Sequence, residues 1–485
     1  EAIWHWMLRH PACLANTPDL PDEPDPGEEG LRWAPGALDG TLAFHFGQPD
    51  GQEKIHAVIR GIQAVLSRLA DPHAMQALYE QLLDGYPLSY LDDLLAALAN
   101  VRNLSATQLQ HLAWWLAKEA PDRNVVKVAM ALMAYFPGEE SIALLTTLGG
   151  HDEFTLYAIV ALRGMLSRTE YDSVWLGLAH RVEGWGRIHL IERLPDPLSD
   201  TTRHWLLRSG CHNTVMDEYT AWHCATSGRL AEALETTPDS ALLLGAATII
   251  QALVSDGPAK GMADYEDGAS ACERYLSHLE QRRADNLTHY LCAQDMATWS
   301  AKQAGEEEDE NMAARWRDVS ARAQALILRE DWATCIQSGF ASDDPDNFAL
   351  AVRAASRRGE DPWPAVFDRQ RRFPNEVHWY TLLQTQNDER AQQAATLAEQ
   401  QLNLASLATG PALKQSAGPE GQAHRILDGI LYNLQPLPGI GWPLVKAGLF
   451  SPMVHNRNMA LQVLDAWHIP GEAIALLKQL RRQEP

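Results

Sequence analysis

The chain has few cysteines, and they form no framework. Its 485 residues contain six cysteines, and no two of them are arranged as a CxxC pair. Disulfide-rich secreted domains and zinc ribbons need closely spaced cysteines, whereas isolated cysteines in a reducing compartment behave as small buried hydrophobes. We therefore expect a cytoplasmic protein.

Long apolar runs are also missing. No segment reaches the roughly 18 apolar residues that a membrane-spanning helix requires. The first residues, EAIWHWMLRHPACLA, show neither a basic beginning nor a long unbroken apolar stretch, so they do not resemble a signal peptide. We expect no membrane association.

Common catalytic signatures are absent as well. The sequence contains no HExxH, GxSxG or Walker pattern. The GIGW stretch at Gly439 is only a glycine-containing turn, because it does not lead from a strand into a helix that faces a phosphate. We expect a protein that is not an enzyme and that carries no cofactor.

Basic side chains are in the minority. There are 40 Lys and Arg residues against 63 Asp and Glu residues, which gives a formal net charge of −23. Such a field repels phosphate backbones and anionic lipid headgroups. Nucleic acid is therefore an improbable partner, and a protein with a basic surface is the favoured one.

Apolar residues, by contrast, are plentiful. Hydrophobic residues make up 46% of the chain and include 16 Trp, which indicates a folded protein with much surface to bury. The length exceeds the roughly 300 residues at which a single core stops growing. The chain should consist of several domains or of a stack of repeats.

A repeat occurs between Lys127 and Val254. Five compact blocks rich in Ala, Leu and Ile start about 30 residues apart, a spacing typical of repeated helix pairs. Amphipathic helices lie between them at 139–148, at 169–182 with Thr169 as candidate N-cap, and at 199–208 with Ser199 in that role. The blocks are VAMALMAYF from Val128, AIVALRGML from Ala158, IHLIERLPD from Ile188, EYTAWHCA from Glu218 and GAATIIQAL from Gly245.

Some of these second helices lack a polar face. Residues 128–136 and 242–254 are apolar almost all round, and such a helix must be covered on several sides, as the inner layer of a stacked array is. The pattern predicts an all-α fold, namely an α-solenoid (α/α superhelix) of helical hairpins with an insertion of longer helices in its middle.

The punctuation by Pro, Gly and acidic residues divides the chain into four segments. The C-terminal helices are expected at 347–358, 363–373, 377–384, 390–404, 422–434, 442–449, 456–467 and 470–480, and the longer helices at 265–283, 287–303 and 311–329. The predicted segments are an N-terminal arm (1–51) with a Pro- and acid-rich loop and a possible small hairpin at LAFHF, an N-terminal solenoid (52–257), long helical hairpins (258–341) and a C-terminal solenoid (342–485).

The stretch SPMVHNRNMALQVLDAWHIPGEAIALLKQL, residues 451–480, resembles the HEAT-like repeat families. Its Asn456 and Arg457 stand at the helix start and precede a Leu-rich helix with small residues, as in that pattern; Ala460, Leu461 and Leu464 fit it too, and Ala158, Leu162 and Arg163 echo it. The chain as a whole resembles uncharacterised bacterial HEAT-like proteins. The resemblance implies a fold of HEAT-like hairpins and little chemistry.

Two aspartate-rich stretches are candidate metal sites. Asp343, Asp344 and Asp346 are clustered, and Asp92-Asp93 in YLDDLLAAL resembles the aspartate-rich start of an all-α terpene-cyclase site. Hard divalent cations prefer such oxygen ligands, so an all-α metal-dependent lyase or cyclase is an alternative function. The simpler interpretation is a helix N-cap followed by acidic residues in the first turn.

The stretch CHNTVMDEYTAWHC also contains residue types that bind zinc. Its spacing fits no standard pair of ligands, so buried structural roles are favoured. The residues concerned are Cys211, His212, Asp217, Glu218, His223 and Cys224.

One cluster of basic residues stands out from the acidic background. Two neighbouring predicted helices carry six arginines, whose guanidinium groups bind carboxylate or phosphate bidentately. The cluster is the candidate binding site, either for an acidic segment or, as a second alternative function, for nucleic acid; internal ion pairing is the simpler explanation. Its members are Arg353, Arg357, Arg358, Arg369, Arg371 and Arg372.

The acidic stretches 19–29 and 306–310 are interpreted as solvated loops rather than as mimics of nucleic acid. Taken together, these patterns favour a non-enzymatic scaffold or inhibitor that binds a basic protein through an acidic concave surface lined by the second helices. A bacterial immunity protein that neutralises a basic toxin fits this description, and so does an adaptor.

Overall fold

The computed structural model describes residues 1–11, 19–23, 33–45, 52–67, 71–102, 104–255, 257–375, 377–414, 421–469 and 471–482. Within these residues the secondary structure is helical, and the sole β-type pairing is an isolated bridge between Lys414 and Met453. The all-α prediction is confirmed. Contacts divide the chain into unit 1, whose described residues end at Trp332, and unit 2, which starts at Ala333.

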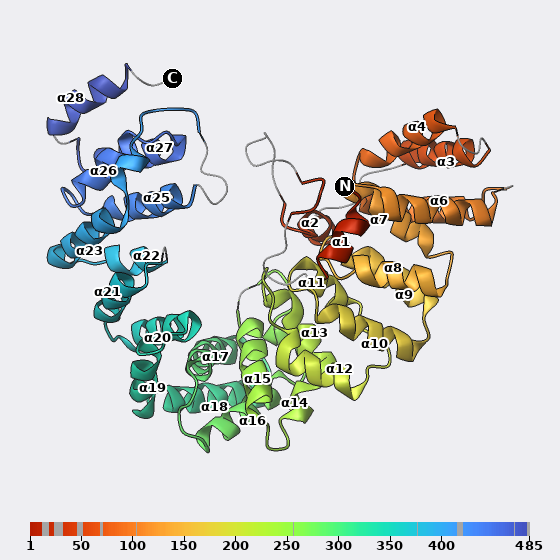
Figure 1. Cartoon of the computed structure of the whole chain (residues 1–485). Coiled ribbons are helices and arrows are strands. Elements are labelled where there is room, and N and C mark those ends of the chain that lie inside the picture. Colours follow the sequence, from red (N-terminus) through yellow and green to blue (C-terminus); the bar gives the residue numbers. More distant parts are fainter. Residues whose placement is uncertain are drawn as a thin grey trace. The chain divides into compact units, whose positions relative to one another are not determined.

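Unit 1 contains most of the helices (Figure 1). One turn of 3₁₀ helix (Pro87–Ser89), a π-helical segment (Leu206–Gly210) and a second 3₁₀ turn (Met262–Asp264) accompany them. The α-helices are α1 (Ile3–Arg9), α2 (Ala37–His45), α3 (Gln52–Ser67), α4 (Pro72–Leu83), α5 (Leu91–Leu98), α6 (Ala106–Glu119), α7 (Arg123–Met133), α8 (Glu139–Leu148), α9 (Thr155–Met165), α10 (Arg168–Ala179), α11 (Trp185–Glu192), α12 (Asp200–Trp205), α13 (Glu218–Gly228), α14 (Leu230–Ala233), α15 (Ser240–Leu253), α16 (Gly268–Glu280), α17 (Leu287–Glu306) and α18 (Glu310–Ile327).

The five predicted second helices are α7, α9, α11, α13 and α15. Each of them contacts the next one in the series, and α15 in turn contacts α17. The first four of them also contact the helix that directly precedes them in the chain, as α8 contacts α9 and α10 contacts α11. The sequential pairing of helices that the repeat predicts is therefore present in unit 1 (Figure 1).

Two of the second helices, α11 and α15, are covered on most of their surface. In α11 every residue from Trp185 to Ile191 is buried, and α15 buries nine residues, including the successive pairs Ala246-Ala247 and Ile249-Ile250. A helix without a polar face is stable only when neighbours cover it on several sides. Helices α11 and α15 therefore lie in the interior of unit 1 and expose little surface of their own.

The N-terminal segment lies against the first repeats. Helix α1 contacts α6 and α8, and α2 contacts α11. The approach of α2 is close, since a Cβ atom at Gly40 would lie 2.1 Å from the Trp185 ring. Residues 37–45 thus form a helix rather than the possible hairpin, because α2 packs against α11, where Ala37 joins an apolar cluster with Trp185 and Ile188.

Longer helices follow, as predicted. Helices α17 and α18 form a helical hairpin and contact each other extensively. Helix α16 packs on α18. Two ion pairs join α16 to α18, namely Arg315 with Glu273 and Arg322 with Glu280, each at 2.8 Å. The acidic turn between α17 and α18 is exposed, in agreement with its interpretation as a solvated loop.

Unit 2 is built from shorter helices around one apolar core. Most of the predicted C-terminal helices are confirmed, those at 422–434 and 442–449 with identical bounds. The helices are α19 (Asp331–Phe340, which starts at the end of unit 1), α20 (Pro345–Arg358), α21 (Trp363–Arg372), α22 (His378–Leu383), α23 (Asp388–Gln401), α24 (Leu404–Leu407), α25 (Gln422–Leu434), α26 (Trp442–Leu449), α27 (Val454–Ala466) and α28 (Gly471–Leu480).

The residues that carry the HEAT-like resemblance connect α27 to its surroundings. Asn456 is buried and donates hydrogen bonds to the backbone oxygen of His424 and to the Asp428 carboxylate on α25. Arg457 is buried and donates to the backbone oxygens of Ala412 and Ser451. These two polar residues therefore fix the start of α27.

Candidate functional site

The six arginines of the predicted binding site do not form one exposed surface. Arg369 is 6% exposed and lies inside unit 2. Its guanidinium group donates to the backbone oxygens of Ser342 and Asp343 at 2.5 and 2.9 Å and stacks over the Phe348 ring at 4.5 Å. Arg369 therefore holds the loop before α20 against α21, and its guanidinium group is already engaged.

The other arginines differ in their surroundings. Arg358 pairs with Glu360 at 2.7 Å, and Arg372 pairs with Asp368 at 3.3 Å. Arg353 and Arg371 are exposed, on α20 and α21 respectively, and neither has an ion pair with a described residue. The binding role predicted for the cluster stays a prediction, now centred on the exposed arginines at the end of α21.

The aspartates before α20 serve as a helix cap. Asp344 accepts hydrogen bonds from the backbone N–H groups of Asp346 and Asn347 at 2.8 and 3.3 Å, as expected for an N-cap residue. Asp92 and Asp93 stand in the first turn of α5, where acidic residues complement the helix dipole. Both aspartate-rich stretches therefore lie at the start of a helix, as the simpler interpretation of them expects.

The Cys and His residues of the other candidate site differ in their exposure to solvent. Cys211 and Cys224 are buried, and burial raises the pKa of both thiols, whereas His212 is exposed. Asp217 accepts a hydrogen bond from the backbone N–H of Asn213 at 2.7 Å. Over the described residues, no group of three or more His, Cys, Asp and Glu side chains is arranged to hold a metal ion.

A buried network of charges in unit 1 lies outside every site predicted from the sequence. Lys127 on α7 contacts Asp39 of α2 at 2.7 Å and Glu153 at 2.5 Å, and all three side chains are buried. Glu153 also accepts a hydrogen bond from the Gly36 backbone N–H at 2.7 Å. A signal was present, because Lys127 is the one charged residue in the otherwise apolar run VVKVAMALM.

The N-terminal acidic stretch extends this network. Arg123, at the start of α7, binds Asp22 at 2.9 Å and also pairs with Glu23. Both carboxylates are largely buried, with side-chain exposures of 13% and 12%. The described part of the stretch is therefore not the solvated loop that was expected, because Arg123 gives its acids a partner; residues 24–29 lie outside the described residues.

Burial and charge act against each other in this network. Burial alone lowers the pKa of Lys127, but the attraction of Glu153 and Asp39 outweighs it, and the pKa stays above its ordinary value. Burial alone raises the pKa of Glu153, yet Lys127 and Arg123 bring it below the ordinary value. Both groups are therefore charged, and the network is an ionic clamp between the N-terminal segment and α7.

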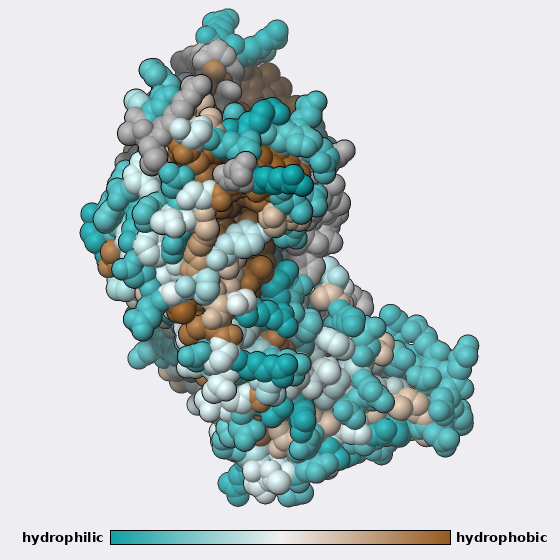
Figure 2. All heavy atoms as spheres, turned by 90° about the vertical axis from the view of Figure 1, so that its right-hand side faces the viewer, coloured by the Kyte–Doolittle hydropathy of each residue, from teal (hydrophilic) through white to brown (hydrophobic). Residues whose placement is uncertain are grey.

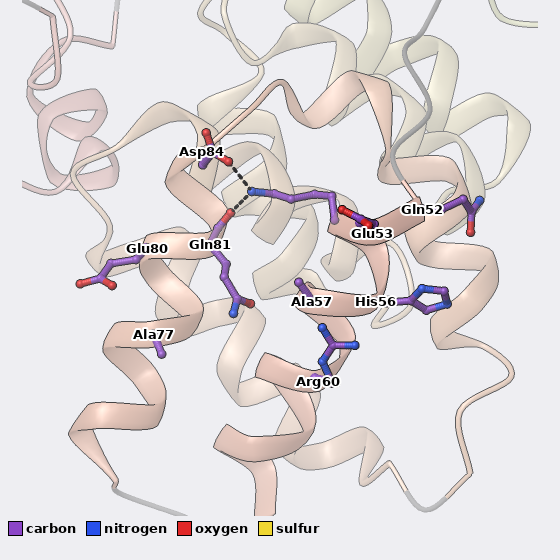
Figure 3. A pocket seen from close by; sticks show the side chains of 10 residues that line it. Gln52, Glu53, His56, Ala57, Arg60, Ala77, Glu80, Gln81 and Asp84 are labelled. Carbon is purple, nitrogen blue, oxygen red and sulfur yellow. Dashed lines mark hydrogen bonds and ion pairs between the residues drawn. The ribbon is translucent and has the colours of Figure 1, made fainter.

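Among the residues that the structure describes, hollows open to solvent include one in each unit. The larger, about 1260 Å³, lies between α3 and α4 in unit 1. Lys54 on α3 donates to the backbone oxygen of Gln81 and to the carboxylate of Asp84, which lies just after α4. Figure 3 shows Gln81 and Asp84 at this hollow. Ala57 and Arg60 also line it. The smaller hollow, about 300 Å³, lies in unit 2 among α21, α22, α23 and α25.

Comparison of the chain with protein-family descriptions, curated proteins and solved structures finds no match in any of the three. The class that the fold defines is thus an all-helical protein with many sequential helix pairings. No described helix is both long and apolar enough to cross a membrane.

Proposed function

We propose that the protein is an α-solenoid of HEAT-like hairpins that binds a protein partner, as a scaffold or as an inhibitor. The observation that supports this proposal is the series α7, α9, α11, α13 and α15, in which each helix contacts the next. Stacked helix pairs of this kind provide extended surfaces, and proteins built from them commonly use those surfaces for binding.

The second helices themselves offer little of this surface, since α11 is almost fully covered. The helices of the other layer are more exposed at their starts. Glu139 and Glu140 begin α8, and Asp200 begins α12, and all three are exposed. In a stack of hairpins, the starts of equivalent helices lie along one edge. We name these three residues the acidic edge and assign the partner surface to it.

The chemistry of the partner follows from charge. With a net charge of −23, the chain attracts a basic protein, and complementary charge accelerates association and selects against acidic partners. The face of unit 1 in Figure 2 also shows a band of hydrophobic residues between hydrophilic ones, which is typical of surfaces that meet other proteins. A toxin-neutralising immunity protein or an adaptor would use such a surface.

The test is affinity capture from the source cell followed by binding measurements with the purified partner. We expect a basic protein whose affinity falls at least about tenfold between about 50 and 500 mM salt, because salt screens exposed charges. The triple variant Glu139→Gln, Glu140→Gln and Asp200→Asn should weaken binding in the same direction. An inhibitor would also abolish the activity of its partner.

A matched control removes acids elsewhere. Glu306, Glu308 and Glu310 lie in or next to the exposed turn between α17 and α18, and their replacement by Gln changes the net charge by the same amount. If both triple variants weaken binding equally, only the overall charge acts and the acidic edge is not the site. If affinity is indifferent to salt, the electrostatic proposal is wrong.

A further inference from the structure

The smaller hollow of unit 2 lies at the N-terminal end of α22. Its volume is about 300 Å³, which is room for one large side chain and part of a peptide backbone. Apolar groups of Pro374, Trp379, Leu402 and Ile426 line it, and amide side chains form the rest of its wall. The wall residues come from α21, α22, α23 and α25, which pack around α22.

The rim of this hollow is unusually apolar for an exposed surface. Phe373, Val377 and Tyr380 lie within eight residues of the chain and are 50%, 65% and 56% exposed. Each of them lies one or two residues away in the sequence from a wall residue, namely Pro374, Asn375 or Trp379. Scattered exposed apolar residues need no explanation, but three beside one hollow are typical of a binding surface.

Positive charge borders the same rim. Arg371 and Arg372 are exposed in the last turn of α21, and the guanidinium group of Arg372 lies 5.8 Å from the centroid of the Phe373 ring. Arg372 forms an ion pair with Asp368 at 3.3 Å, whereas Arg371 has no ion pair with a described residue. A basic, aromatic rim within an acidic protein calls for an acidic ligand.

The amides on the wall are partly preorganised. Gln370 donates to Gln401 at 2.8 Å, and Gln401 donates back to the Gln370 backbone oxygen at 2.9 Å. The side chain of Gln422 makes no hydrogen bond with another described residue, and no described acceptor takes the side-chain N–H of Asn375. A fixed amide pair beside two available amides suits the alternating N–H and C=O groups of an extended peptide.

We propose that this hollow and its rim, the α22 surface, bind an acidic linear segment of a partner protein. An apolar side chain of the segment enters the hollow, its backbone meets Asn375 and Gln422, and its carboxylates meet Arg371 and Arg372. The α22 surface belongs to unit 2 and has the opposite charge preference to the acidic edge of unit 1. Either proposal can therefore fail without the other.

The experiment uses the full chain and three labelled peptides, followed by fluorescence anisotropy. The first peptide alternates Asp with Gly around one central Phe, the second has Ala in place of Phe, and the third has Lys in place of Asp. We expect the first to bind with a Kd on the order of 10 to 100 μM. The second should bind at least about fivefold more weakly, and the third should not bind.

Two pairs of variants locate the site. The double variant Arg371→Glu and Arg372→Glu should weaken binding of the first peptide at least about tenfold. The control Arg102→Glu with Arg163→Glu makes the same charge change at exposed positions in unit 1 and should change affinity less than about twofold. Val377→Asp should likewise weaken binding, whereas Leu328→Asp, at a residue 77% exposed in unit 1, should not.

Three results would overturn the proposal. The first is that the acidic Phe peptide does not bind at millimolar concentration. The second is that the charge control weakens binding as much as the α21 variant, which would reduce the effect to net charge. The third is that a single-stranded oligoribonucleotide binds as tightly and is insensitive to Val377→Asp, which would make the surface a general anion site. Circular dichroism of every variant confirms that the helices are intact.

Discussion

The ammonium group of Lys127 on α7 lies 2.7 Å from a carboxylate oxygen of Asp39 on α2, although the two side chains are only 2% and 3% exposed. The partners are 88 residues apart in the chain. The carboxylate of Glu153, on the turn before α9, lies 2.5 Å from the same ammonium group. The contact therefore joins three separate segments, and the position of the N-terminal segment depends on it.

Removal of the ammonium group should be costly. In the Lys127→Ala variant, Asp39 would remain buried without its cation and Glu153 would keep only Arg123, at 3.9 Å. Breaking a buried pair in this way typically costs about 3–5 kcal/mol. We expect a loss of that size in the free energy of unfolding, measured by urea denaturation. Lys302 is exposed on α17, so Lys302→Ala is the matched control and should change stability by less than about 0.5 kcal/mol.

A second test separates the charge from the packing. If Lys127 acts mainly through its charge, the variant that combines Lys127→Met with Asp39→Asn and Glu153→Gln should recover much of the stability, because no uncompensated charge remains. Equal instability of the single and the triple variants would mean that the shape of the lysine side chain, and not its charge, holds the segment.

Stability should fall as the pH is lowered, partly through His151. This residue is 2% exposed, and burial lowers its pKa from 6.5 to about 4. Between these two values the unfolded chain binds a proton that the folded chain does not, so the loss of stability begins near pH 6.5 and is complete near pH 4. A difference of this size corresponds to about 3 kcal/mol.

The geometry explains why protonation of His151 is unfavourable. Its Nδ1 atom accepts a hydrogen bond from the Glu153 backbone N–H at 3.2 Å, which an imidazolium ring cannot do. The His151→Asn variant keeps an acceptor there and does not titrate. Denaturation curves at pH 7 and pH 5 should differ less for His151→Asn than for the parent chain. Replacement of the exposed His56 by Asn should leave the difference unchanged.

The inner helices could be predicted from the sequence because their pattern is local. Blocks of apolar residues at about 30-residue spacing identify α7 to α15, and α25 and α26 have the predicted bounds. The predicted start of one helix was wrong where two candidate N-cap residues lie close together. Ser167, and not Thr169, caps α10, because Ser167 forms a reciprocal capping box with Glu170, and this pattern lies only two residues earlier in the chain.

The ionic clamp could not be predicted in the same way. Charge and proline content make the stretch around Asp22 look solvated, and only the position of Arg123 in space, 101 residues later, changes that. Long-range ion pairs leave no periodic signal in a single sequence. The same limit applies to the arginine cluster, since residue type alone does not distinguish the buried Arg369 from the exposed Arg371.

The two aspartates directly before α20 should differ in their contribution to stability. Asp344 accepts two backbone hydrogen bonds, whereas Asp343 is exposed and caps nothing. Asp344→Ala should therefore lower the free energy of unfolding by about 1 kcal/mol, and Asp343→Ala should leave it nearly unchanged. If the cluster instead binds a divalent cation, Mg²⁺ should raise the thermal midpoint of the parent chain, and either substitution should remove that increase.

The buried arginine of the cluster should behave differently from its exposed neighbour. Arg369→Ala removes hydrogen bonds to the backbone oxygens of Ser342 and Asp343, and it also removes the stacking over Phe348. Hydrogen bonds from a charged donor contribute about 1.5–3 kcal/mol each, and the orphaned carbonyl oxygens would stay partly buried. We expect unit 2 to lose about 3 kcal/mol of stability in Arg369→Ala, measured by chemical denaturation.

Arg371→Ala serves as the comparison, because Arg371 is exposed only two residues further along α21. The variant should change the free energy of unfolding by less than about 0.5 kcal/mol. It should also weaken binding of the acidic Phe peptide to the α22 surface. Arg369→Lys should rescue only part of the loss, since an ammonium group cannot donate to both carbonyl oxygens in the planar geometry of guanidinium. Equal effects of Arg369→Ala and Arg371→Ala on stability would contradict the division of the cluster into one structural and one available arginine.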